Sequence, residues 1–372
     1  MKNTIYMDYN ATCPIRASVI ETVVSTMAEV GNPSSVHVAG RKARSTVEEA
    51  RAKVAALVGA RPRDVMFCSG GTEASNAVIF GSGAKSLIVS AIEHDCVLAA
   101  AKEADIPVFT LPVNESGMVS LAALRKLLAG APAPALVSVM FANNEMGAIQ
   151  PVAEISTMAK EFDAFVHSDA VQAAGKLPID MQTLGVNYLT LSSHKIGGPQ
   201  GVGAVVLSPT ALLKPLIVGG GQELGRRSGT ENVAGIAGFG EAAIEALSEL
   251  SESERLSRLR DKMEEALRTH TNELIIVAEK AERLANTSCL AIPGVKGETQ
   301  VMHFDLAGIC VSSGSACSSG KVKVSHVLNA MGYPEEVASS SIRVSLGYSS
   351  TEADVETFVE AWKKLYDRTV RR

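Results

Sequence analysis

Short hydrophobic runs alternate with longer amphipathic segments along most of the chain. Strands separated by helix-length segments are typical of a mostly parallel sheet covered by helices on both faces. We therefore predict an α/β fold whose large domain holds a mostly parallel, seven-stranded sheet. Its strands are expected at residues 65–68, 86–92, 108–111, 136–142, 164–167, 188–191 and 203–207.

The pattern changes on both sides of this region. Two helical segments, 17–30 and 37–58, precede the first strand. Near residue 247 the composition turns to Glu, Ser, Arg and Lys in one helical stretch, 247–271, which we expect to lead into a smaller α+β domain. Its strands are predicted near 273–277, 289–292 and 342–345, and its helices include 325–331 and 351–368. We thus predict a large domain at 15–250 and a small domain built from 1–14 and 251–372.

Composition narrows the class of protein. The 372 residues suffice for one large and one smaller core, and 46% hydrophobic with 20% charged residues is an ordinary globular balance. A net charge of -5 implies no broad cationic surface, which argues against a general nucleic-acid binder.

No apolar run is long enough to span a membrane, and the first residues contain no apolar leader segment. Six scattered cysteines without a Cys-x-x-Cys pair predict reduced thiols, a cytoplasmic location, and neither a disulfide framework nor a metal site.

One stretch combines a buried strand with reactive side chains. After the predicted strand 188–191 come Ser192, Ser193, His194 and Lys195, followed by a glycine-rich turn. A lysine desolvated at the end of a buried strand is suited to form a Schiff base with an aldehyde. The alternative is an ordinary surface lysine on a hairpin, and this stretch alone favours neither.

Other polar groups stand at the ends of the remaining strands, where functional groups of such sheets gather. Gly71 and Thr72 open a helix after the first strand, which suits either a phosphate site or simple capping. His94 follows the second strand and could stack on a flat ring or be structural. Asn144 offers an amide to a phenolic oxygen, and Asp169 could be an N-cap.

A single cofactor accounts for all of these groups together. Pyridoxal phosphate requires a Schiff-base lysine, an aspartate on its pyridine nitrogen, a phosphate site and a ring-stacking partner. Lys195, Asp169, the segment 69–76 and His94 supply these four parts. We therefore predict a pyridoxal-phosphate enzyme.

The same residues resemble a known family. The chain is similar to the cysteine desulfurases of the NifS/IscS branch, which are class V pyridoxal-phosphate enzymes of the aminotransferase superfamily. The resemblance runs from Met7 to about Thr351, nearly the whole chain. It includes the motifs at 31–35, 69–76, 143–145, 169–172, 192–198, 219–223, 226–232, 312–319 and 341–343. It implies a fold-type I transferase that acts as a homodimer on L-cysteine.

The resemblance also implies roles for individual residues. Lys195 would form the Schiff base, His94 would stack on the ring, and Asp169 would pair with the pyridine nitrogen. Arg343, helped by Asn32, would hold the substrate carboxylate. The remaining contacts would come from Asn144 and Gln172 at the ring hydroxyl, from Gly71, Thr72, Ser192 and His194 at the phosphate, and from Thr230 at the phosphate of the neighbouring subunit.

A segment of small residues, about 312–324, contains Cys317. With so little that can pack, this segment is expected to be mobile. An isolated cysteine there could be merely an exposed thiol. The resemblance instead implies that Cys317 accepts sulfur from L-cysteine, leaving L-alanine and a persulfide. That sulfur would pass to an acceptor protein, for iron–sulfur cluster assembly or another thiolation. Lys195, His94 and Cys317 would then be the catalytic residues.

One departure and two alternatives remain open. Where the family commonly has Ser-Leu-Glu-Pro, this chain has Lys321-Val322-Lys323-Val324. The charge of the two lysines could lower the pKa of the thiol, steer an acidic acceptor, or simply be solvated. The first alternative is a selenocysteine lyase or other class V enzyme, although an aminotransferase needs no thiol at Cys317. The second is a non-catalytic binding subunit, which Lys195 and Asp169 argue against.

Overall fold

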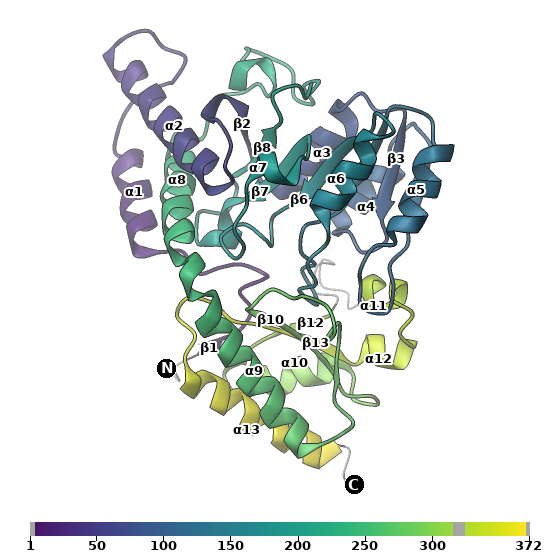
Figure 1. The fold of residues 1–372 in the computed structure, drawn as a ribbon. Helices are drawn as coiled ribbons and strands as arrows, with labels where there is room; N and C mark the ends of the chain where they lie inside the picture. The colour runs from purple at the N-terminus through teal and green to yellow at the C-terminus, as the bar shows by residue number, and fades with distance from the viewer. Residues whose placement is uncertain (1–3, 315–323, 370–372) are drawn as a thin grey trace.

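The computed structural model of the chain describes residues 4–314 and 324–369. Figure 1 shows a large sheet with its helices in the upper part of the molecule and a smaller sheet with its own helices below. Cys317, Lys321 and Lys323 lie outside the described residues. Among the helices that are described, none is long and apolar enough to cross a membrane.

The large sheet has the seven strands that the hydrophobic runs predict, in the order β2-β8-β7-β6-β5-β3-β4. Strand β8 is antiparallel to β2 and β7, and the other neighbouring strands pair in parallel. The prediction of a mostly parallel sheet is confirmed. The strands are β2 (Val65–Cys68), β3 (Ser86–Ser90), β4 (Val108–Leu111), β5 (Ala135–Ser138), β6 (Phe165–Asp169), β7 (Tyr188–Ser192) and β8 (Gly203–Leu207).

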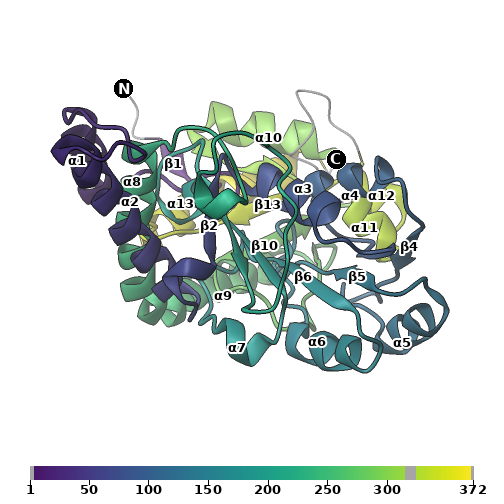
Figure 2. The ribbon, with the colours of Figure 1, turned by 90° about the horizontal axis from the view of Figure 1, so that it is seen from above.

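Helices bury both faces of this sheet. The described helices of this part are α1 (Ala17–Met27), α2 (Val38–Leu57), α3 (Gly71–Gly81), α4 (Asp95–Lys102), α5 (Leu121–Gly130), α6 (Val152–Lys160), α7 (Met181–Leu184) and α8 (Val233–Ser248). Figure 2 shows α3 and α4 on one side of β5 and β6, with α5 and α6 on the other. Strands such as β2, β7 and β8 are therefore buried at every position, as expected of a sheet covered on both faces.

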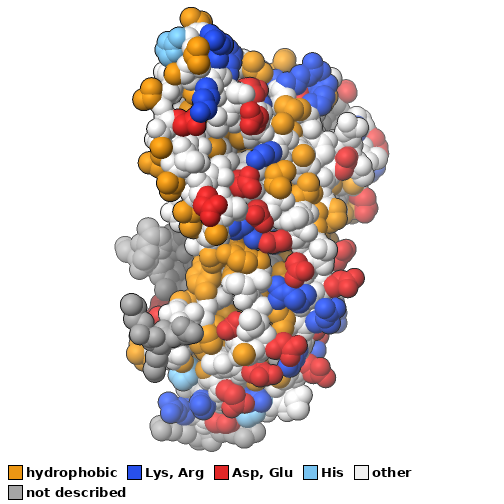
Figure 3. Space-filling view, turned by 90° about the vertical axis from the view of Figure 1, so that its left-hand side faces the viewer, with side chains coloured by type: hydrophobic (Ala, Val, Ile, Leu, Met, Phe, Trp, Pro, Cys, Tyr) orange, Lys and Arg blue, Asp and Glu red, His pale blue; other side chains and the backbone are white. Residues whose placement is uncertain are grey.

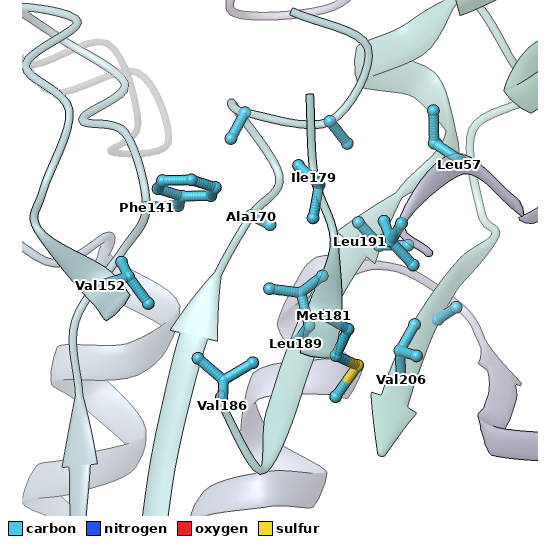
Figure 4. Packing of buried hydrophobic residues seen from close by; sticks show 14 of the residues in the cluster. Leu57, Phe141, Val152, Ala170, Ile179, Met181, Val186, Leu189, Leu191 and Val206 are labelled. Carbon is cyan, nitrogen blue, oxygen red and sulfur yellow. The ribbon is translucent and has the colours of Figure 1, made fainter. Parts of the chain in front are cut away.

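Successive side chains of a strand therefore enter two different hydrophobic clusters. Val65 and Phe67 pack with α2 and α8, whereas Met66 and Cys68 pack with α3 and α4. Figure 4 shows part of the first cluster, in which Leu189 and Leu191 of β7 lie near Val206 of β8. This two-sided burial fixes the position of each strand end, because a register shift of one residue would exchange the two faces.

The smaller sheet is antiparallel, in the order β12-β13-β10-β9. Its strands are β9 (Ile275–Ile276), β10 (Thr287–Ala291), β12 (Ser312–Ser313) and β13 (Ser341–Ser345), and β1 (Ile5–Tyr6) pairs with β11 (Ile309–Cys310) beside it. Its helices are α9 (Ser253–His270), α10 (Gly297–Leu306), α11 (His326–Ala330), α12 (Glu335–Ser339) and α13 (Glu352–Thr369). A separate hydrophobic cluster joins Met7 to Phe358 and Trp362. The domain boundaries at 15–250, 1–14 and 251–372 stay a prediction.

The structure corrects two predicted elements. The helix expected at 247–271 is interrupted by the 3-10 helix Glu249–Glu252, between α8 and α9. There the hydroxyls of Ser248 and Ser251 donate to backbone carbonyls, a competition that disfavours a regular α-helix. The strand expected at 136–142 ends at Ser138, although residues 139–142 remain buried.

A buried ion pair ties a strained turn to the edge of the large sheet. The Nη1 and Nη2 atoms of Arg51 donate to Glu223, at 2.6 and 2.9 Å, and the Phe67 amide donates to the same carboxylate. Glu223 and its neighbour Leu224 have φ values of 48° and 57°, in the left-handed region that residues with a side chain rarely adopt. The pair therefore holds a backbone conformation that is unfavourable by itself.

Replacing Arg51 should be far more costly than replacing an exposed arginine with the same bonding. We expect Arg51→Ala to lower the free energy of unfolding by about 3–5 kcal/mol, because the Glu223 carboxylate stays buried without its partner. The matched control is Arg125→Ala, since Arg125 pairs with Glu161 through two nitrogens at the surface. That change should cost about 1 kcal/mol or less. Urea unfolding measures both, and equal losses would contradict the account.

Candidate active site

A single cavity collects most of the residues that the sequence singles out. It lies where the strands β2, β3, β5, β6 and β7 end, and its volume is about 290 Å³. Its walls also include Arg343 from β13 of the smaller sheet. The predicted residues on its walls are Gly71, Thr72, His94, Asn144, Asp169, Gln172, Ser192, His194, Lys195 and Arg343.

Lys195 lies on the 3-10 helix Ser193–Ile196 that follows β7. Its Nζ donates to the backbone carbonyl oxygens of Asn10 at 2.6 Å and of Ala11 at 2.9 Å. The turn ends at Gly197, whose φ of 83° favours glycine. The N-terminal segment therefore holds the amine at the wall of the cavity.

His194 lies beside Lys195 and is neutral near pH 7. Burial and the charge of Lys195 lower the pKa of His194 to about 4. Its Nδ1 lies 3.1 Å from the Thr12 hydroxyl. A neutral imidazole can still donate one hydrogen bond to an anion without carrying a charge.

The predicted phosphate site combines a helix N-terminus with close backbone packing. Helix α3 begins at Gly71, and Gly70 before it provides no side chain to cap the first amides. A Cβ atom on Gly203 would lie 2.6 Å from the Cα of Gly70, so glycine at the start of β8 lets the loop lie against the sheet. Uncapped amides at a helix N-terminus attract anions.

Asp169 and His94 occupy two further walls. Asp169 ends β6, and its Oδ1 accepts from the Val171 amide at 2.8 Å. Burial raises the pKa of Asp169, while His94 and Lys195 act in the opposite direction. A cationic ring nitrogen close to Asp169 would favour the charged carboxylate. His94 is the N-cap of α4, and its Nδ1 accepts from the Cys96 amide at 3.2 Å.

Arg343 reaches the cavity from β13 and is almost completely buried. It donates to Asp8 Oδ1 at 2.7 Å and to the Asn144 carbonyl oxygen at 3.0 Å. Its Nε is buried without a hydrogen-bond partner among the described residues. A guanidinium on the wall of a cavity is suited to a carboxylate ligand.

Three predicted residues lie elsewhere. Asn32 lies in an exposed loop, where its Oδ1 accepts from the Ser34 amide. It does not line the cavity that contains Arg343 of the same chain. Thr230 lines a different hollow, together with Arg227 and Asn232. Cys317 is outside the described residues. The roles predicted for these three residues stay predictions.

The structure adds residues that the sequence did not indicate. Asn10, Ala11, Cys96, Met140 and Val171 also line the cavity. Asn10 matters most, since it is completely buried and its carbonyl oxygen accepts from both Lys195 and Gln172. It lies in an irregular segment far along the chain from both partners, so no local pattern could have revealed it.

The residues present fit pyridoxal phosphate. An amine, a buried aspartate, uncapped amides and a histidine surround one cavity, and these are the parts that this cofactor requires. The fold and the site together define a class, the pyridoxal-phosphate enzymes built on a mostly parallel sheet.

Comparison with known proteins specifies this class. A model of the aminotransferase class-V family matches residues 5–358, and the chain belongs to this family. The chain is 40% identical over 379 residues to cysteine desulfurase IscS of Dictyoglomus turgidum, covering 99% of this chain and 96% of that protein.

Two solved structures are also similar. One is a NifS-like protein from Rickettsia africae, with 40% identity, 98% of this chain and 99% of that chain covered, and a TM-score of 0.92. The other is SspA in complex with cysteine, with 30% identity, 92% of this chain and 99% of that chain covered, and a TM-score of 0.78. These confirm the predicted fold class.

Glu145, next to Asn144, is a buried carboxyl group close to this cavity. Its Oε2 accepts from the Ser325 hydroxyl at 2.5 Å, and Ser325 is the N-cap of α11. Burial raises the pKa of Glu145 to about 7, although Ser325 and Arg343 lower it. The hydrogen bond between Glu145 and Ser325 therefore involves a carboxyl group that titrates near neutral pH.

The raised pKa of Glu145 predicts a pH-dependent loss of stability. From its ordinary value of 4.5 up to about 7, the carboxyl ionises in the unfolded chain but not in the folded one. The free energy of unfolding should fall across this window by about 3 kcal/mol from this group alone. Glu145→Gln should lack this part of the decline in urea unfolding, whereas the exposed control Glu154→Gln should keep it. Parallel curves for all three proteins would contradict the assignment.

Proposed function

We propose that this protein is a cysteine desulfurase, which removes sulfur from L-cysteine and leaves L-alanine and a persulfide on Cys317. The observation that carries the proposal is the single cavity where Lys195, Asp169 and Arg343 meet. The relatives named cysteine desulfurase and the neighbour in complex with cysteine support the same substrate. A persulfide on Cys317 would then be passed to an acceptor protein.

The cavity would hold pyridoxal phosphate at its aldehyde, its ring and its phosphate. Lys195 would bind its aldehyde and Asp169 its ring nitrogen, with His94 stacked on the ring. Asn144 and Gln172 would lie at the ring hydroxyl, and the phosphate would be held by Gly71, Thr72, Ser192 and His194. When bound, the cofactor supplies an electron sink that stabilises negative charge at the α-carbon of the substrate.

The residues of the chain would then bind the substrate and move its proton. Arg343 on the cavity wall would hold the carboxylate through its guanidinium group. The Lys195 amine would accept the α-proton at Nζ, with His94 available to relay it. Asp8, which holds Arg343 at 2.7 Å, would keep its guanidinium oriented.

Sulfur transfer would be a direct attack by the Cys317 thiolate on the sulfur of cysteine. A bond forms between the two sulfur atoms, and the bond between that sulfur and the β-carbon breaks. Its electron pair stays with the substrate carbon, which gains a proton and becomes the methyl group of alanine. The products balance without an outside oxidant or reductant.

We also infer a homodimer. Ile20, Val24 and Met27 recur on one face of α1 and are 45%, 62% and 72% exposed. Figure 3 shows this side of the molecule, with hydrophobic side chains exposed among charged ones over its upper part. A second copy would cover such a stripe. Thr230, which lies outside this chain's own cavity, would then contact the phosphate of the partner.

The destination of the sulfur and the compartment belong to the same proposal. An acceptor or scaffold protein for iron–sulfur clusters suits a persulfide donor, since the sulfur leaves as a group bound to a protein thiol. The cysteines among the described residues, Cys13, Cys68, Cys96, Cys289 and Cys310, are all free. Free thiols suit a reducing, cytoplasmic location.

One spectroscopic experiment tests the proposed function. The absorption spectrum of the purified holoenzyme is recorded before and after adding L-cysteine, and alanine and sulfide are assayed in the same sample with a thiol reductant. We expect a cofactor band that changes on addition, with alanine and sulfide released together. A band indifferent to cysteine would contradict the substrate, and no band at all would contradict the role of Lys195.

The variant Cys317→Ser separates substrate binding from sulfur transfer. It should keep the cofactor band and its change with L-cysteine, yet form no persulfide and lose at least about 100-fold in sulfide release, because it has no thiolate nucleophile. Cys310→Ser is the matched control and should behave as the unaltered protein. Full sulfide release by Cys317→Ser would contradict the mechanism.

A further inference from the structure

A second lysine lies next to Lys195 and has no part in the mechanism above. Lys176 lies in the turn that follows β6 and also contains Gln172. Its Nζ donates to Gln172 Oε1 at 2.8 Å and to Asn10 Oδ1 at 2.9 Å. Both acceptors are neutral amides of buried residues. The ammonium group is thus held among polar groups that carry no compensating charge.

Asn10 joins the two lysines. Its backbone oxygen accepts from Lys195 at 2.6 Å, and its side-chain oxygen accepts from Lys176. Lys176 and Lys195 also line a second hollow, which is separate from the cavity described above. Two amines that donate to the same residue are close enough for the positive charge of each to lower the proton affinity of the other.

The other charged or titratable groups near Lys176 do not offset its charge. Burial raises the pKa of the Cys13 thiol to about 11, so it is neutral near pH 7. Arg343 is itself a cation and is paired with Asp8. The carboxylates on the wall of the hollow, Glu249 and Glu252, are paired with Arg16 and Arg255.

We propose that Lys176 is a positioning residue of the active site, whose charge lowers the proton affinity of the nitrogen of Lys195. The proposal rests on the proposed function, in which that nitrogen must be neutral to attack an aldehyde and to accept a proton. Lys176 would also fix the amide of Gln172, because Oε1 faces its ammonium and Nε2 is left to donate to the Asn10 carbonyl.

The titration of Lys176 itself agrees with this arrangement. Burial, followed by the charges of Lys195 and Arg343, lowers the pKa of Lys176 to about 7. The same repulsion acts on Lys195, because the interaction of two charges is mutual. Asp169 opposes it, since its carboxylate interacts favourably with Lys195.

The test is a spectrophotometric pH titration of the holoenzyme without substrate. The absorption band of the bound cofactor reports whether the nitrogen of Lys195 carries a proton. In Lys176→Met and Lys176→Gln the midpoint should rise by about 1 pH unit, a tenfold gain in proton affinity, because a neighbouring positive charge is gone. Lys176→Arg keeps a positive charge at this position and should not raise the midpoint, and the exposed control Lys126→Met should leave it unchanged.

The outcomes distinguish this inference from the proposed function. An unaltered protein without any cofactor band would contradict the proposed function itself. Bands in all proteins with the same midpoint would overturn only the role of Lys176. A rise in Lys176→Met but not in Lys176→Gln would also overturn it, because hydrogen bonding rather than charge would then be responsible.

Discussion

Parallel pairing of the central strands is the constraint on which the site depends. Strands β3, β4, β5, β6 and β7 run in one direction, so their carboxyl ends meet at the same edge of the sheet. Except for the edge strand β4, these strands are buried on both faces, which fixes their register and therefore the position of the residues that follow them. Residues more than a hundred positions apart, such as His94 and Lys195, reach one cavity for this reason.

The rest of the site comes from segments outside the large sheet. Residues 7–14 run between the two sheets and supply the carbonyl oxygens that hold Lys195, while β13 supplies Arg343. The cavity is thus closed by contacts between distant parts of the chain. Several ionisable groups are buried there, and their altered pKa values follow from desolvation and from one another's charges.

Much of this arrangement could be predicted from local sequence. Short apolar runs predicted all seven strands of the large sheet, and small or polar residues at their ends indicated Lys195 and Asp169 without reference to any family. Lys195 could be recognised because a lysine after a buried strand is unusual. The roles of all the site residues stay predictions, and those of Asn32, Thr230 and Cys317 came from resemblance alone.

What the sequence could not reveal depends on contacts between distant residues. Asn10 and Lys176 have no motif, and their importance is visible only when both touch the segment around Lys195. The pairing of Asp8 with Arg343 joins residues at opposite ends of the chain. The interruption at Glu249–Glu252 was missed because serine hydroxyls that bond to the backbone leave the helical spacing of the sequence unchanged.

The central claim is that Lys195, and not the neighbouring Lys176, carries the cofactor. It is tested most directly by reducing the holoenzyme with borohydride and locating the pyridoxyl group by peptide mass spectrometry. The account predicts the modification on Lys195 alone, because Asn10 and Ala11 hold that amine at the cavity wall beside Asp169. Modification of Lys176, or of neither lysine in a protein that shows the cofactor band, would contradict it.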